Sequence, residues 1–151
     1  MKKKAKIFLF LTIIIFIVYL IMLPSEENVY EKIGKELRFD TSDCEIIKSE
    51  DSHGGFHGDG ETYIILNCQN NPLKLFEWKS LPLPSNLNKT LNKEQEISKV
   101  EEGYYYFVNT FNRYYNTGID IHDESSLSMN NYLIAIYDKK NNFLYYYEFD
   151  S

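Results

Sequence analysis

An uncharged apolar run close to the N-terminus constrains this chain more than any other feature. The run begins at Ile7 and ends at Leu23, and none of its 17 residues carries a charge. A helix of that length measures about 25 Å, which is near the lower limit for crossing a bilayer. A helix buried in a protein core would normally keep one polar face. The run therefore predicts a transmembrane helix over residues 7–23.

The flanking residues predict how this helix is oriented. Lysines fill four of the six positions in the tail 1–6, whereas all 22 acidic residues follow the apolar run. Because basic residues stay on the cytoplasmic side, we expect a single-pass protein of the cell membrane with residues 24–151 outside the cytoplasm. Cleavage as a signal peptide is not favoured, since residues 20–23 offer no small side chain before a cut. The helix is expected to remain as the anchor.

The part of the chain after the anchor is predicted to form one acidic domain. Residues 24–151 have room for one hydrophobic core. Without the four lysines of the tail, the chain has 12 basic and 22 acidic residues, which gives residues 24–151 a net charge of −10. Nucleic acids and anionic lipid head groups are bound largely through lysine and arginine. We therefore expect membrane contact only through the anchor, and no binding of nucleic acid.

Two cysteines are placed so that they can pair across a hairpin. One strand-like segment begins at Cys44, another ends at Cys68, and a glycine-rich stretch separates them. If the hairpin is symmetric about Phe56, Cys44 lies opposite Cys68 and Ile47 lies opposite Ile65. A disulfide is compatible with the oxidising side of a membrane. We expect this bond, with two free buried thiols as the alternative.

The stretch between the cysteines is the most unusual in the chain. Four glycines occur within seven positions, next to two of the three histidines and several carboxylates. Such glycines indicate backbone that needs positive φ or the close approach of another group. Loops on a rigid scaffold often carry binding sites. The candidate binding residues are His53, Gly54, Gly55, Phe56, His57, Gly58, Asp59 and Gly60.

This loop has two further interpretations. In the favoured one the glycines build a tight loop, and Asp51 and Asp59 accept hydrogen bonds from its backbone amides, so that no cofactor is needed. In the other, His53, His57 and Asp59 bind one divalent metal such as zinc, and residues 122–124 complete the site. The spacing matches no established metal signature. No nucleophile with a nearby base is evident, so no catalytic residue is assigned and an enzyme is not favoured.

Hydrophobic patterning predicts an α+β domain with one mainly antiparallel sheet. Two or three short helices are expected, of which one spans residues 25–37 and another, capped by Ser85, spans 86–92. Residues 113–128 are expected to form a long loop. About five strands are expected, at residues 44–49, 62–68, 104–111, 131–137 and 143–149, and the last two form a hairpin around 138–142.

Clusters of tyrosine occur at residues 104–106, 114–115 and 145–147. In a strand such clusters place aromatic side chains on both faces of the sheet. One face must be core. The other is predicted either to contact a partner, because tyrosine is common in binding surfaces, or to be an ordinary covered face, because tyrosine favours strands.

Around the run His53-Gly54-Gly55-Phe56-His57-Gly58-Asp59-Gly60, the sequence resembles small membrane-anchored or secreted proteins of low-GC Gram-positive bacteria that have no known activity. The resemblance implies an envelope location and no particular reaction.

These features favour a non-catalytic interaction or sensing module at the cell envelope, with an envelope protein or a cell-wall component as partner. The alternative is a metal-binding protein or metal-dependent hydrolase that uses His53, His57 and Asp59.

Overall fold

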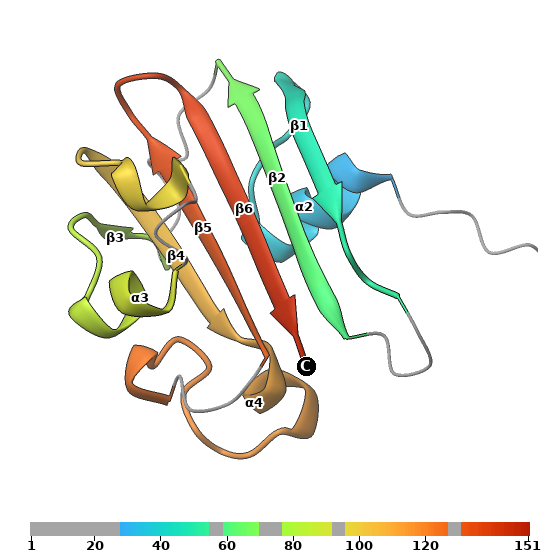
Figure 1. Cartoon of the computed structure of the whole chain (residues 1–151), viewed down its shortest axis with the longest axis vertical. Coiled ribbons are helices and arrows are strands. Elements are labelled where there is room, and N and C mark those ends of the chain that lie inside the picture. Colours follow the sequence, from blue (N-terminus) through green and yellow to red (C-terminus); the bar gives the residue numbers. More distant parts are fainter. Residues whose placement is uncertain (1–27, 55–58, 70–76, 92–95, 127–130) are drawn as a thin grey trace, which may run out of the picture.

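A single antiparallel sheet of six strands organises the domain (Figure 1). The computed structural model describes residues 28–54, 59–69, 77–91, 96–126 and 131–151. The strands lie in the order β1-β2-β6-β5-β4-β3. The α+β class is confirmed, with six strands instead of five because β3 is too short to show an alternating pattern. The strands are β1 (Cys44–Asp51), β2 (Gly60–Cys68), β3 (Lys79–Ser80), β4 (Gly103–Asn109), β5 (Tyr132–Asp138) and β6 (Phe143–Asp150).

Helices cover both faces of the sheet. The α-helices within the described residues are α2 (Val29–Leu37), α3 (Ser85–Thr90) and α4 (Thr110–Tyr115), and short 3-10 helices span Glu96–Lys99 and Glu124–Ser126. On one face α2 packs against the buried side chains Ile64, Leu66, Tyr106, Val108, Leu133, Ala135, Tyr137, Leu144 and Tyr146. On the other face Leu87, Leu91 and Ile97 pack against Tyr63, Ile65, Tyr105, Phe107, Tyr132, Ile134, Ile136, Tyr145 and Tyr147.

Local capping explains where α2 begins and ends. The side chain of Asn28 accepts a hydrogen bond from the backbone N–H of Tyr30 at 3.1 Å, which starts the helix at Val29. Arg38 follows Leu37 in the left-handed conformation, and its N–H donates to helix carbonyls. The expected first helix is thus confirmed over Val29–Leu37, and residues 25–27 lie outside the described residues.

The other predicted helix needs a correction. α3 spans Ser85–Thr90, and Ser85 is its first helical residue and not its cap. Pro84 precedes the helix with extended backbone, and its carbonyl accepts from the N–H of Asn88 at 3.0 Å. Proline suits this position because it fixes the φ angle at the entrance of the helix.

The hairpin of β1 and β2 contains a β-bulge that the sequence did not indicate. Cys44 pairs with Cys68 as predicted, but Lys48 instead of Ile47 lies opposite Ile65. The register shifts by one residue between Ile46 and Lys48, so Ile47 is the extra residue and is 54% exposed. The predicted pairing of Ile47 with Ile65 is therefore wrong. The hairpin is symmetric only in the half that contains the cysteines.

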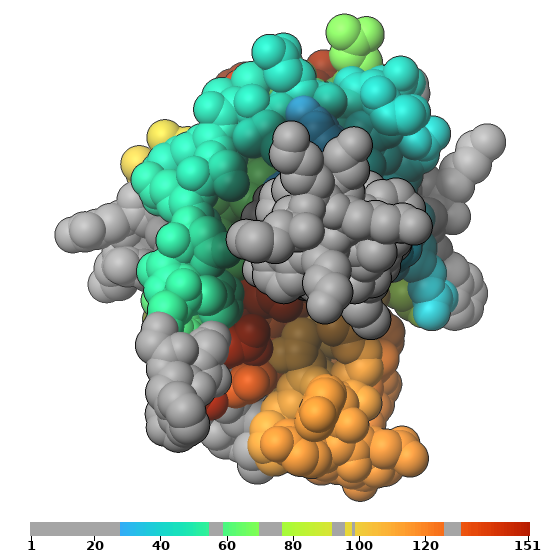
Figure 2. All heavy atoms as spheres, turned by 90° about the vertical axis from the view of Figure 1, so that its right-hand side faces the viewer, coloured from blue at the N-terminus to red at the C-terminus, as the bar shows by residue number. Residues whose placement is uncertain are grey.

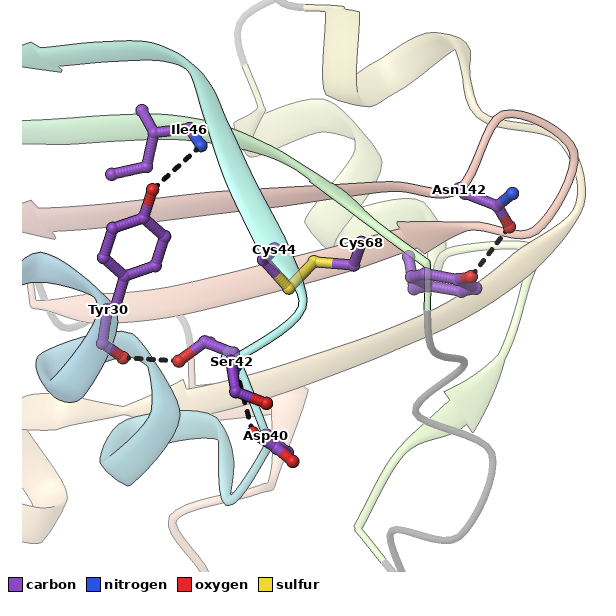
Figure 3. Close-up of a disulfide and its surroundings, with 9 residues drawn as sticks. Tyr30, Asp40, Ser42, Cys44, Ile46, Cys68 and Asn142 are labelled. Atoms are coloured by element: carbon purple, nitrogen blue, oxygen red, sulfur yellow. Dashed lines mark hydrogen bonds between the residues drawn. A yellow bond between two sulfur atoms is a disulfide. The ribbon is translucent and has the colours of Figure 1, made fainter.

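The predicted disulfide between Cys44 and Cys68 is present (Figure 3). The Cα atoms of the two residues are 4.2 Å apart, and no free cysteine is found in the described residues. Cys68 is fully buried under α2, and its N–H donates to the carbonyl of Asn142 at 2.9 Å. Nearby, the hydroxyl of Tyr30 accepts from the N–H of Ile46, so that β1 is also tied to the helix.

The tyrosines of the sheet are buried on both faces. Tyr105, Tyr145 and Tyr147 face α3, whereas Tyr106 and Tyr146 face α2, and all of them are at most 6% exposed. The idea that one face of tyrosines meets a partner is therefore wrong for the sheet. The prediction did not foresee that α3 and the 3-10 helix Glu96–Lys99 cover the second face of the sheet.

The membrane prediction falls on residues that the structure does not describe. Both the tail 1–6 and the apolar run 7–23 lie outside the described residues. Within the described part of the chain, no helix has the length and apolar character needed to cross a bilayer.

Loss of the disulfide should weaken the domain. Replacing both Cys44 and Cys68 by serine removes a cross-link between residues 24 positions apart. Because the cross-link restricts the unfolded chain, we expect the free energy of unfolding to fall by about 3.5 kcal/mol. Urea unfolding of the variant and of the parent chain measures the difference. A change below about 1 kcal/mol would show that this account of the cross-link is wrong.

Buried tyrosines should make the domain sensitive to alkali. Burial raises the pKa of eight tyrosines above the usual value of this side chain. For Tyr106 the pKa is raised to about 12. Because the folded pKa lies above the unfolded value, this stabilisation is complete below about pH 10 and is lost as the pH rises further. Each tyrosine then lowers the free energy of unfolding by about 1.4 kcal/mol per pH unit. The residues are Tyr63, Tyr105, Tyr106, Tyr132, Tyr137, Tyr145, Tyr146 and Tyr147.

Urea unfolding measured at a series of pH values from about 9 to about 11.5 tests this expectation. The variant Tyr146→Phe removes one ionisable ring that is fully buried. It should make the decline shallower by the contribution of one tyrosine. A free energy of unfolding that stays constant over this range would contradict the prediction.

Candidate functional site

An open cavity lies at the end of the sheet where β6 ends. Its volume is about 700 Å³. In Figure 2 the surface is hollowed between β1 (teal) and the segment that contains α4 (orange), and atoms of the C-terminal strand (red) lie deeper. We call this cavity the α4 groove. Its lining residues are Asp59, Thr110, Phe111, Arg113, Tyr114, Tyr115, Asn131, Glu148, Asp150 and Ser151.

One wall of the groove is α4, which the sequence analysis missed. The predicted strand 104–111 stops at Asn109, because the side chain of Asn109 accepts from the N–H of Asn112 at 2.9 Å and caps a helix there. Asn116 adopts the left-handed conformation and ends that helix. The expected loop 113–128 therefore begins inside a helix. This change of backbone brings the side chains of Phe111, Arg113, Tyr114 and Tyr115 to the groove.

Three aromatic side chains of α4 form a cluster at the rim. Tyr114 is 82% exposed and Tyr115 is 62% exposed, in contrast to the buried tyrosines of the sheet. The ring centroids of Phe111 and Tyr115 are 4.5 Å apart, and those of Tyr114 and Tyr115 are 4.9 Å apart with an angle of 80° between the rings. Exposed apolar surface gathered beside a cavity is typical of a binding site.

Ion pairs with α2 fix the charged side chains on the floor of the groove. Glu148 of β6 lies 2.6 Å from Nζ of Lys32 and accepts a hydrogen bond from the hydroxyl of Tyr146 at 3.0 Å. Arg113 of α4 pairs with Glu36. Both contacts tie the groove to the helix that covers the core. They also neutralise the charges of Glu148 and Arg113.

His53, a predicted site residue, lies beside the groove. Its Nδ1 is 2.6 Å from Oδ1 of Asp51 and 3.2 Å from Oγ1 of Thr62. Its Nε2 is 3.5 Å from Oδ2 of Asp150, which lines the groove. The backbone N–H of His53 also donates to Asp51, and this bond, followed by that of the ring, keeps the pKa of the Asp51 carboxyl below its usual value. Asp51 thus caps the loop as predicted.

The glycines of the loop differ in what they permit. A Cβ atom on Gly60 would lie 2.6 Å from Cα of His53, so only glycine allows the two backbone segments to approach. Gly54 has ordinary space around it. Asp59 lines the α4 groove. The remaining predicted site residues, Gly55, Phe56, His57 and Gly58, lie outside the described residues.

Two of the three predicted metal ligands, His53 and Asp59, are among the described residues. In the described part of the chain, no group of three or more histidines, cysteines and carboxylates is arranged to hold a metal ion. His57 is not described, so a site built from His53, His57 and Asp59 stays a prediction. His122 cannot complete it, because His122 contacts β4 whereas His53 contacts β2, and three strand spacings separate these strands by about 14 Å.

The role of His122 is instead to cover the edge of β4. Its Nδ1 lies 2.8 Å from the carbonyl oxygen of Phe107, and its neighbour Ile121 accepts from the N–H of Asn109 at 2.8 Å. Glu124 accepts hydrogen bonds from Lys79 and from the hydroxyl of Tyr105. The contacts of His122 and Ile121 satisfy backbone groups of β4 that the two-residue β3 leaves open.

The contacts of His53 do not form a nucleophile and base pair. A hydroxyl nucleophile needs one imidazole nitrogen while an acid orients the other. Here Asp51 and Thr62 both contact Nδ1, and Nε2 faces a carboxylate. The arrangement anchors the loop and does not activate Thr62.

No protein-family model matches this chain, and neither a curated protein nor a solved structure is significantly similar to it. The resemblance to small envelope proteins therefore stays a prediction.

The exposure of the rim gives a test of stability. Tyr114→Ala should change the free energy of unfolding by less than about 0.5 kcal/mol, because its side chain is mostly in water. Tyr146→Ala should lower it by about 4 kcal/mol, because that ring is fully buried. Urea unfolding of both variants measures the contrast. A large loss for Tyr114→Ala would mean that the aromatic rim is part of the core.

Proposed function

We propose that this chain is a membrane-anchored, non-catalytic binding module whose domain lies outside the cytoplasm and holds its ligand in the α4 groove. The apolar run 7–23 behind four lysines supports the anchor and its orientation. The bond between Cys44 and Cys68 supports an oxidising location, since disulfides rarely persist in the cytosol.

The single observation that carries the binding role is the exposure of Tyr114 and Tyr115 beside a cavity. Apart from the half-buried Tyr104, the sheet buries its own tyrosines almost completely, so the domain has the means to cover aromatic rings. A ring left in water forgoes the stabilisation that burial would give. Tyrosine supplies large contact area with little loss of side-chain freedom when a partner covers it.

The chemistry of the groove supports binding over catalysis. Two residues with aliphatic hydroxyls, Thr110 and Ser151, line it, and Oγ1 of Thr110 has no hydrogen-bond partner among the described residues. Neither hydroxyl contacts the Nε2 atom of His53, whose neighbour is Asp150. A nucleophile without a base in reach is weak.

Photocrosslinking in living cells tests the binding role. A photoreactive phenylalanine analogue at position 114 of the full chain should form an adduct with an envelope component, because this side chain borders the groove. The same analogue at Lys89, which is exposed on α3 at the opposite face of the sheet, is the matched control. Mass spectrometry identifies the adducts.

An adduct at position 114 that is absent at position 89 supports the proposal. No adduct at either position, or equal adducts at both, would overturn the assignment of the groove. In the same cells the chain should fractionate with membranes and should be cut by protease added from outside. A chain that resists external protease but is cut after lysis would overturn the orientation.

A further inference from the structure

The charges around the α4 groove are unequal. Three carboxylates line it, from Asp59, Glu148 and Asp150, against the single cationic side chain of Arg113. Glu148 is neutralised by an ion pair with Lys32, and Arg113 is neutralised by Glu36. Asp59 and Asp150 are left as the acidic groups that face the cavity. A ligand that fits this groove should therefore carry positive charge.

The two aspartates lie close together because of the sheet register. Gly60 pairs with Asp150 across β2 and β6, and Asp59 directly precedes Gly60. Asp150 keeps 35% of its side-chain surface exposed, and Nε2 of His53 lies 3.5 Å from its Oδ2. Among the residues that the structure describes, Asp59 forms no ion pair. One extended ligand could place cationic groups on both carboxylates.

The aromatic rim suits the same kind of ligand. The rings of Tyr114 and Tyr115 meet at 80°, so they form a corner and not a flat platform. A flat platform would favour the stacking of a sugar ring. A corner offers one ring face to a cation and a second ring to the alkyl stem that carries it. The cavity of about 700 Å³ is large enough for a few side chains.

Resting on the proposed binding role, we infer that the α4 groove binds a basic peptide segment. Ammonium or guanidinium groups of the segment lie against Asp59 and Asp150, and their alkyl stems lie on Tyr114 and Tyr115. The net charge of −10 on residues 24–151 attracts such a segment from a distance. The partner is accordingly a protein or peptide rich in lysine or arginine, and not a glycan.

Fluorescence anisotropy with the full chain in a non-ionic detergent tests this inference. The probe is a short labelled peptide of alternating lysine and glycine, compared with one of alternating glutamate and glycine. We expect binding of the lysine peptide only, with about tenfold weaker affinity when the salt is raised to about 0.5 M. Equal binding of both peptides would overturn the inference.

Charge-neutralising variants locate the binding. Asp59→Asn and Asp150→Asn should each lower the affinity for the lysine peptide by a factor between about three and about ten. Glu101→Gln removes the same charge at the far end of β4 and should leave the affinity unchanged. If Glu101→Gln weakens binding as much as Asp150→Asn does, the attraction is general and the groove is not the site. Asp59→Asn keeps the test valid if Asp150→Asn unfolds the domain.

Variants at the rim separate cation recognition from simple apolar contact. Tyr114→Phe should keep the affinity, whereas Tyr114→Leu should weaken it about threefold, because leucine has no ring face for a cation. Equal affinity of the Leu and Phe variants would overturn the role of the aromatic face. If an oligomer of N-acetylglucosamine binds in a manner that depends on Tyr114 while the lysine peptide does not bind, the inference falls and the binding role of the groove stands. Failure of the crosslinking at position 114 would overturn both the binding role of the groove and the inference of a basic peptide.

Discussion

The pairing of β2 with β6 is the contact on which the rest of the structure depends. It joins a hairpin from the first half of the domain to the meander of β4, β5 and β6 that ends the chain. The ladder runs from the pair Gly60 and Asp150 to the pair Asn67 and Phe143. Without it each part would expose an apolar face, and few strands are stable alone. The groove is built where this ladder ends, so the site and the core share one set of hydrogen bonds.

Much of this sheet follows from local pattern. The last hairpin was predictable because two continuous apolar and aromatic runs flank a polar turn, in which Asp138 accepts from the N–H groups of Lys140 and Asn141. The pairing of the cysteines followed from their spacing. Symmetry failed at Ile47, because a bulge adds one residue without changing the pattern of residue types on either side. The order of strands could not be read locally, since β2 meets β6 across more than half the domain.

The site was predictable only in part. Glycine and histidine drew attention to the loop, where Asp59 does line the groove and His53 lies beside it. The other wall was hidden because the aromatic density before and after Asn109 continues a strand pattern, whereas the capping side chain turns it into a helix. A signal was present in Asn109, Asn116 and Gly118, which are residues that favour helix ends. The strand propensity of the aromatic residues was outweighed by a single hydrogen bond, from the N–H of Asn112 to the side chain of Asn109.

The bulge in β1 has a consequence for how copies of this domain behave beside one another. β1 is an outermost strand, and the backbone groups along its free side could pair with a strand of a neighbouring molecule. Such growth needs an unbroken ladder. The extra residue Ile47 interrupts the regular backbone next to Lys48, and a bulge and a charged side chain both disfavour pairing of this edge with a second copy. The bulge in β1 therefore acts against sheet-to-sheet aggregation at this edge, at the cost of one exposed apolar side chain.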